Sequence, residues 1–100
     1  MENRMQSIVD RLDSDDITIQ LIEECAELIQ ACAKLIRAYK GTTPVSVSQA
    51  RANFVEEMAD VSVAQAAAML GVMRPEEQEA MMRTESDKAQ RWQERIEKGV

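Results

Sequence analysis

Two short acidic motifs, each set inside a long apolar and alanine-rich run, limit most strongly what this chain can fold into. They read Glu23-Glu24-Cys25-Ala26-Glu27 and Glu56-Glu57-Met58-Ala59-Asp60. Each motif places two carboxylates three residues apart, and on a helix that spacing brings both side chains to one face. The pattern therefore predicts two long helices, each of which presents a pair of acidic groups at one spot.

The periodicity of the apolar residues predicts four helices and no strand, within a single domain that spans residues 1–100. A short first helix ends at the acidic cluster Asp13–Asp16. The later helices are expected to run from this cluster to about Lys40, from about Val47 to Leu70, and from Pro75 onward. Thr84–Asp87 resembles a further helix start, so a kinked or split last helix, giving five in all, is the alternative. The expected fold class is an all-α bundle.

Local signals support these ends. Gly41 is a C-terminal stop, Ser46 and Gln49 have the spacing of a capping box, and Pro75 suits the first turn of a helix. The apolar faces expected to be buried on the second and third helices comprise Ile22, Cys25, Ala26, Ile29, Cys32, Ala33 and Ile36, and Val55, Met58, Ala59, Ala66, Met69 and Leu70.

The surroundings of the acidic pairs separate two interpretations of them. Glutamates on a helix are usually solvated, and for an isolated pair that is the simpler interpretation. Here the residues close to Glu24 and Glu57 in helical angle include Leu21, Leu28, Ala31 and Leu35 for the first, and Val61, Ala64 and Ala68 for the second. Partly buried carboxylates that converge from two helices repel one another unless cations or protons compensate them. The pattern therefore favours a metal site.

The ligand set indicates which metal. The chain has no histidine, so a di-iron carboxylate centre built on Glu-x-x-His pairs is excluded and zinc is disfavoured. Four carboxylates point to Mg²⁺, with Mn²⁺ as a substitute, and Mg²⁺ usually retains waters for a phosphate-bearing substrate. No Gly-x-x-x-x-Gly-Lys-[Ser/Thr] loop is present, so the chain is not a P-loop NTPase.

The net charge of the chain limits the kinds of molecule that it is expected to bind. A net charge of −6, with no basic stripe apparent, argues against a nucleic-acid polymer or an anionic membrane surface as a partner. No run reaches the length of a transmembrane helix and no signal-peptide core is seen, so the cytoplasm is the expected location.

Cys25 and Cys32 are poorly spaced for a disulfide within one helix and are interpreted as reduced core residues. With three aromatic residues and seven methionines, the core must be largely aliphatic.

These residues resemble the ExxE…ExxD signature of the MazG-like all-α nucleoside triphosphate pyrophosphohydrolases, a superfamily that includes the dimeric dUTPases and dCTP pyrophosphatases. The matching positions are Glu24-x-x-Glu27 and Glu57-x-x-Asp60, the doubled acids at 23–24 and 56–57, the preceding Gln20-Leu21-Ile22, and more loosely Lys88-x-x-Arg91. The main match spans about residues 17–70. The connection of roughly thirty residues between the motifs is at the long end for the family, and this departure affects the loop rather than the ligands.

The resemblance implies hydrolysis between the α and β phosphates of a nucleoside triphosphate, which yields a monophosphate and pyrophosphate. Carried onto this chain, the Mg²⁺ ligands would be Glu24, Glu27, Glu57 and Asp60. The metal would neutralise phosphate charge and lower the pKa of the attacking water. Glu24 is the first choice for the acid that accepts the proton and Glu23 the second, because spacing alone does not place the water.

Other positions are weaker candidates for substrate binding. Lys88 and Arg91 share one face of the last helix and would meet the β and γ phosphates, as the family's C-terminal basic residues suggest; the alternative is that both are solvated. Gln20 and Asn53 each precede a metal ligand by one turn, which suits an amide that reads a base edge, against the simpler interpretation as surface amides. Trp92 suits stacking on a base but is more often a packing anchor.

Two other classes of function remain open. One is an inactive MazG-like module that acts as a dimerising adaptor, and the other is a structural bundle whose acidic pairs are accidental. In every case the chain is expected to form a homodimer or homotetramer, because the apolar sectors of the second and third helices are wider than the first and fourth helices can cover.

Overall fold

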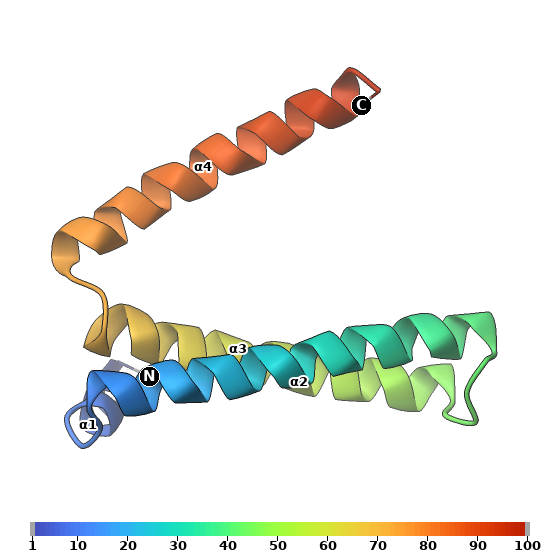
Figure 1. The fold of residues 1–100 in the computed structure, drawn as a ribbon, viewed down its shortest axis with the longest axis horizontal. Coiled ribbons are helices and arrows are strands. Elements are labelled where there is room, and N and C mark those ends of the chain that lie inside the picture. Colours follow the sequence, from blue (N-terminus) through green and yellow to red (C-terminus); the bar gives the residue numbers. More distant parts are fainter. Residues whose placement is uncertain (1, 100) are drawn as a thin grey trace.

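The computed structural model describes residues 2–99, and within them the chain is helical, with no strand. The four helices are α1 (Glu2–Val9), α2 (Ser14–Lys40), α3 (Val47–Gly71) and α4 (Pro75–Glu97), as Figure 1 shows. The predicted all-α class and the four helices are thus confirmed. Helix α4 is continuous, so the alternative of a split at Thr84–Asp87 is wrong. No glycine or proline interrupts this stretch, and a threonine or serine caps a helix only where the backbone has already turned extended.

Local capping interactions set both ends of α2 and the start of α3. Asp13 Oδ1 accepts a hydrogen bond of 2.8 Å from the backbone N–H of Asp16 at the start of α2. At the other end Gly41 adopts φ 70°, a left-handed conformation that glycine tolerates best, and its N–H donates to the carbonyls of the last turn. Ser46 and Gln49 form the predicted capping box of α3, with bonds of 3.1 and 3.2 Å.

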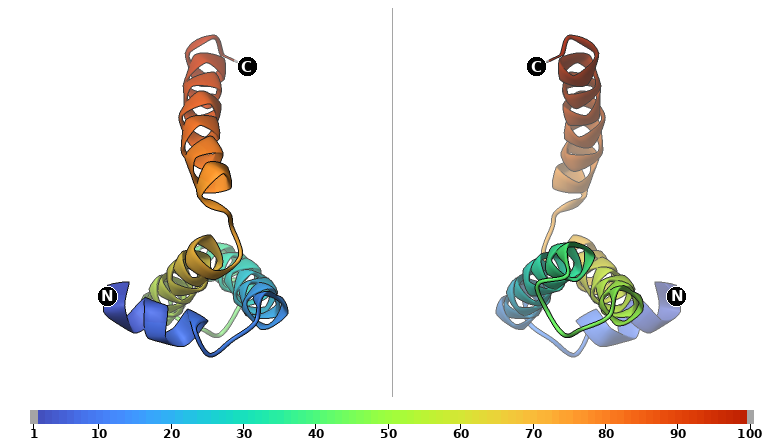
Figure 2. Two further views of the ribbon diagram at one scale, coloured as in Figure 1. Left: turned by 90° about the vertical axis from the view of Figure 1, so that its left-hand side faces the viewer. Right: turned by 90° about the vertical axis from the view of Figure 1, so that its right-hand side faces the viewer.

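Helices α2 and α3 form an antiparallel hairpin, and the views in Figures 1 and 2 agree that they lie side by side. Small residues line their contact. The buried alanines of this hairpin are Ala31, Ala38, Ala50, Ala64 and Ala67. Because alanine has only a methyl side chain, the two backbones can approach closely along much of their length. Short side chains on this face also leave room for the longer carboxylates that lie among them.

The apolar faces predicted to be buried in α2 and α3 are mostly exposed, so this prediction is wrong for the single chain. Ile22, Ile29 and Val55 have 63%, 69% and 61% of their surface exposed, whereas Cys32, Ala33, Ala66 and Met69 are half-buried. The physical reason is that one hairpin buries one stripe on each helix. The alanine stripe with its carboxylates occupies that contact, and the bulkier stripe faces away from it.

Helix α1 packs across the open end of the hairpin. Met5, Ile17 and Ala67 form a small core there, with Val9 and Ala68 against it. Gly71, the last residue of α3, makes this possible: a Cβ atom added there would lie 2.6 Å from Ile17 Cδ1 and 3.2 Å from Val9 Cβ. A side chain at 71 would therefore push α1 away from the hairpin.

Helix α4 stands away from the rest of the chain, as both side views in Figure 2 show. Gln78 Nε2 donates a 2.7 Å hydrogen bond to the carbonyl of Met69 and ties the base of α4 to α3. All described residues after Met81 are exposed. The radius of gyration is 17.0 Å, against about 13 Å for a compact chain of this length. Across residues 2–99, none of the helices is long and apolar enough to cross a membrane.

The close contact at Gly71 predicts that replacing it with alanine lowers stability, whereas helix propensity alone predicts an increase. Propensity favours alanine over glycine by about 1 kcal/mol, but overpacking a filled site costs about 1–3 kcal/mol, and Ile17, at 2% exposed, has little room to move. Gly71→Ala should therefore lower the free energy of unfolding, measured by chemical denaturation. Ser62→Ala, on the exposed side of the same helix, is the matched control and should be nearly neutral. A rise in stability for Gly71→Ala would contradict the α1 packing.

Candidate metal centre

Four carboxylates meet on the inner face of the α2–α3 hairpin. Glu24 and Glu27 come from α2, and Glu57 and Asp60 come from α3. One oxygen from each residue can be chosen so that all four lie within 4.8 Å of one another. Because the two acids on each helix are three residues apart, both reach the same contact. The folded chain thus brings together the four residues that the two motifs singled out.

Two of these carboxylates have an oxygen that is shielded from solvent and unpaired. Glu24 Oε2 and Glu57 Oε2 are buried and have no hydrogen-bond partner among the described residues. The other oxygen of Glu24 accepts a 2.7 Å hydrogen bond from Gln20 Nε2. A shielded polar atom without a hydrogen-bond partner destabilises the folded state, and more so when it carries charge. These two oxygens therefore point to a proton or a cation as the missing partner.

Electrostatics lead to the same conclusion. Burial raises the pKa of Glu24, and the charges of Glu27, Asp60 and Glu23 raise it further, while the hydrogen bond from Gln20 acts in the opposite direction. Burial also raises the pKa of Glu57, followed by the charge of Glu27 and its close approach to Glu57. Without a cation, the folded protein therefore holds protons on this cluster more tightly than an unfolded chain does.

The dimensions of the cluster fit a hard cation. Mg²⁺ binds oxygen at about 2.1 Å, so its opposite ligands lie roughly 4.2 Å apart. The four carboxylate oxygens lie within 4.8 Å of one another, a separation that lets them gather around one such ion as the side chains move inward. A donor set made wholly of carboxylates suits Mg²⁺ or Mn²⁺ and offers no nitrogen or sulfur for zinc. Glu24, Glu27, Glu57 and Asp60 can thus hold such an ion.

The other predicted positions on α2 and α3 lie around this centre. Gln20 orients Glu24 through the hydrogen bond described above. Glu23 is exposed and lies outside the group of four, although its charge contributes to the raised pKa of Glu24. Asn53 is half-buried one turn before Glu57. Of these three, Gln20 has the most direct contact with the carboxylate cluster.

A recess of about 220 Å³ opens beside the carboxylates, between the hairpin and α1. Gln20, Glu24 and Asp60 lie on one side of it, and the remaining wall is apolar. Sequence reasoning missed this wall, which is formed by Met5, Ile8, Leu12, Ile17, Val63, Ala64 and Ala67. Met5 and Ile8 have helical spacing in the sequence, but nothing in the sequence shows that α1 crosses the hairpin.

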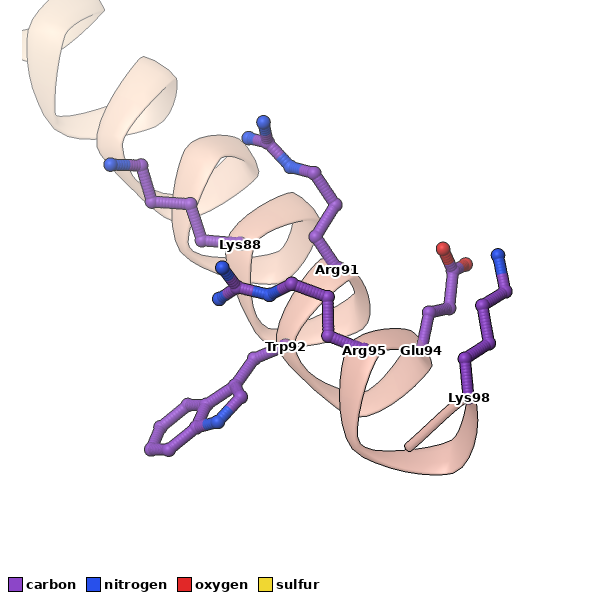
Figure 3. A pocket seen from close by; sticks show the side chains of 6 residues that line it. All are labelled: Lys88, Arg91, Trp92, Glu94, Arg95 and Lys98. Carbon is purple, nitrogen blue, oxygen red and sulfur yellow. The ribbon is translucent and has the colours of Figure 1, made fainter. Parts of the chain in front are cut away.

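Lys88 and Arg91 do not meet the carboxylates in the single chain. They lie on α4, where with Arg95 and Lys98 they line a surface hollow formed by α4 residues alone (Figure 3). This hollow is open to solvent, and none of the four carboxylates of the metal centre lines it. The four basic residues also correct the inference of no basic stripe, because the net charge of the whole chain conceals them.

Comparison of the chain with models of known protein families gives no match, and neither curated proteins nor solved structures give one. The function must therefore be argued from the chain's own residues.

The raised pKa values predict how stability depends on pH when no metal is present. Between the ordinary value of 4.5 and the raised values, the folded state binds more protons than the unfolded state, so these two groups reduce stability as pH rises. Glu57→Gln removes one of them. The melting temperature of this variant minus that of the wild type, both in chelator, should thus be more positive at pH 7 than at pH 4.

The matched control for this experiment is Glu56→Gln, which removes an exposed neighbour and should show little of this pH dependence. Adding Mg²⁺ at pH 7 should raise the melting temperature of the wild type more than that of Glu57→Gln. Equal responses of the wild type and Glu57→Gln to both pH and Mg²⁺ would contradict the metal centre.

Proposed function

We propose that this protein is a Mg²⁺-dependent hydrolase that converts ribo- or deoxyribonucleoside triphosphates to monophosphates and pyrophosphate. The observation that carries the proposal is the convergence of four carboxylates from two adjacent helices. Two of these carboxylates, Glu24 and Glu57, each have a shielded oxygen with no hydrogen-bond partner among residues 2–99. The same four residues make up the ExxE…ExxD pattern that resembles the MazG-like pyrophosphohydrolases. All four positions carry the acidic groups that such a reaction requires.

The recess beside the cluster supports a nucleotide as the substrate. Its volume of about 220 Å³ corresponds to roughly seven water molecules in the liquid, which is room for a heterocyclic base and too little for a whole triphosphate. The rest of its lining is apolar and suits the faces of a base, and the amide of Gln20, which also lines it, can hydrogen-bond a polar ring atom. A nucleotide whose base enters this recess would thus keep its phosphates near the carboxylates.

In the proposed reaction, Glu24, Glu27, Glu57 and Asp60 hold Mg²⁺, which when bound neutralises phosphate charge and lowers the pKa of the attacking water. Glu24 is the proposed proton acceptor, since Gln20 fixes one of its oxygens and the other has no hydrogen-bond partner among the described residues. Glu23 is the second choice for this role. Asn53 is a candidate for a further contact with the substrate.

A phosphate contact by Lys88 or Arg91 would require a second copy of the chain, because α4 in its own chain projects away from the carboxylates. The exposed apolar faces of α2 and α3 favour such an assembly. The large side chains of Ile22, Ile29 and Val55 are exposed to solvent in the single chain. Exposed apolar surface of this kind marks an interface. We therefore include a homodimer or homotetramer in the proposal.

The second candidate function is an inactive helical adaptor, which the same exposed apolar faces favour. Calorimetric titration with Mg²⁺, with and without a non-hydrolysable nucleoside triphosphate, separates the two candidates. An enzyme should bind both ligands cooperatively, because the phosphates complete the coordination of the metal. An adaptor needs neither ligand.

The reaction class is tested by incubating the protein with Mg²⁺ and a panel of nucleoside triphosphates, then identifying the products by ion-exchange chromatography. Monophosphate and pyrophosphate are the expected products. Release of orthophosphate and diphosphate would overturn the proposed site of cleavage, and no turnover of any substrate would favour the adaptor.

Neutralising any one of the four ligands should abolish most of the activity. Glu24→Gln, Glu27→Gln, Glu57→Gln and Asp60→Asn should each reduce kcat/KM by more than the 10–100-fold that loss of an outer-shell group costs, while circular dichroism shows an intact helical fold. Glu56→Gln is the control, because this exposed residue lies outside the cluster. Full activity of Asp60→Asn would contradict the proposed ligand set.

Assembly should be measurable by light scattering across a dilution series, with specific activity read in parallel. We expect a mass of two or four chains at micromolar concentration and loss of that mass with dilution. If a second copy completes the substrate site, activity should fall together with the mass. A stable monomer with undiminished turnover would show that one chain builds the whole site.

A further inference from the structure

One surface of α4 has the features of a helix-pairing face, and its side chains are exposed in the single chain. Residues recur along it at alternating steps of three and four, the spacing that keeps a seam facing a partner helix: Met82, Glu85, Ala89, Trp92 and Ile96. Met82, Trp92 and Ile96 are 66%, 64% and 65% exposed. In Figure 3 the indole of Trp92 projects from the helix on a different side from Arg91 and Lys98.

The charges of α4 are divided along its length. Residues 75–87 carry five acidic groups and one basic group, whereas residues 88–98 carry four basic groups and two acidic ones. One half of the helix therefore has a net charge of −4 and the other half +2. An antiparallel partner of the same sequence would place each acidic half against a basic half, whereas a parallel partner would place like charges together and repel.

We propose that α4 pairs with α4 of a second copy of this chain as a short antiparallel coiled coil, related by a two-fold axis near residue 87. This is an isologous contact and therefore closes as a dimer. The register follows from the seam: Met82 lies against Trp92 of the second copy, and Glu85 lies against Ala89. The overlap from residue 78 to residue 96 is about 28 Å long.

This register joins side chains that suit one another. The thioether of Met82 meets the large aromatic ring of Trp92, a favourable sulfur–aromatic contact. Glu85, the acidic residue in the seam, lies against the small Ala89 and next to Lys88 of the second copy, so that its carboxylate has both room and a counter-charge.

The charge order selects a second α4 over the other apolar surfaces of the molecule. The exposed faces of α2 and α3 belong to a body, residues 1–74, with a net charge of −4, which complements the basic half of α4 and repels the acidic half. Another α4 offers both signs in the matching order. The pairing is independent of the proposed reaction, and it leaves the α2 and α3 faces free to form a second interface.

Charge reversal tests the pairing without removing any apolar contact. Glu85→Lys and Lys88→Glu, each prepared alone, put like charges at both symmetry-related contacts between residues 85 and 88 of the two copies. At a concentration where the wild type is assembled, each variant should have half the wild-type mass by light scattering. A mixture of the two variants restores both attractive contacts and should regain the wild-type mass. Glu94→Lys, which lies away from the seam, is the control and should keep the wild-type mass.

Disulfide trapping tests the direction and register. In a background of Cys25→Ser and Cys32→Ser, a Met82→Cys chain mixed with a Trp92→Cys chain should form a mixed disulfide under mild oxidation. Neither chain should link to itself, because residue 82 lies about 15 Å along the pair from its own copy and a disulfide needs Cα atoms within about 7 Å. Gln90→Cys, on the opposite side of α4, is the control and should not link to Met82→Cys.

Three outcomes would overturn the proposal. A Trp92→Cys chain that links to itself would indicate a parallel pair, and one that links to an Ile29→Cys chain would place α4 on the α2 face of another copy. A mixture of the charge-reversed chains that fails to regain the wild-type mass would remove the electrostatic basis. None of these readouts depends on catalysis, so a failure here leaves the proposed reaction standing, and an inactive enzyme leaves the pairing standing.

Discussion

The close approach of α2 and α3, which depends on alanine along their contact, is the constraint from which the main features of the molecule follow. Methyl side chains at Ala31, Ala64 and Ala67 let the two backbones come near enough for acids on opposite helices to meet. With leucine or isoleucine at these positions, the helices would separate and the carboxylates would reach solvent singly. The same contact therefore provides both the packing of the hairpin and the high density of negative charge within it.

Two contributions to the free energy of folding act in opposite directions at the α2–α3 contact. Burying the alanines stabilises the hairpin, but each methyl group removes little apolar area from water. Bringing four carboxylates together destabilises it unless protons or a cation compensate them. A protein that only needed to be stable would gain by replacing Glu57 or Glu24 with an apolar residue, since both reach into a partly buried contact. Acids at these positions are thus better explained by a ligand than by packing.

Sequence reasoning succeeded where the determining interactions are local. Both ends of α2 and the start of α3 follow from Asp13, Gly41 and Ser46, which act within four residues of themselves. The carboxylate cluster was predictable because the spacing within each motif fixes a helix face, and because a hairpin with a short loop brings the two faces together. Repulsion among the acids then suggested the cation.

The same reasoning failed to predict which of two apolar faces on each helix is buried between α2 and α3. Helices α2 and α3 each carry an alanine stripe and a stripe of large aliphatic residues, and hydrophobicity alone favours burial of the larger ones such as Ile29 and Val55. The structure buries the smaller ones within the chain. Sequence periodicity identifies both stripes, but the choice between them depends on how closely two backbones can approach, which is a tertiary property. For the same reason, the apolar recess under α1 could not be foreseen.

The exposed stripes and the free-standing α4 have a common physical origin. A chain of 100 residues has a limited core, and this one uses its tightest contact to hold acidic groups rather than large apolar side chains. The large apolar side chains are then left exposed, and burying them against another surface would be favourable because apolar surface in water is unfavourable. Helix α4 cannot provide that cover for α2 and α3 in its own chain, since it contacts α3 only near its base. A single chain of this sequence therefore leaves many of its large apolar side chains exposed, and the proposed self-association and the carboxylate cluster both depend on alanine at the α2–α3 contact.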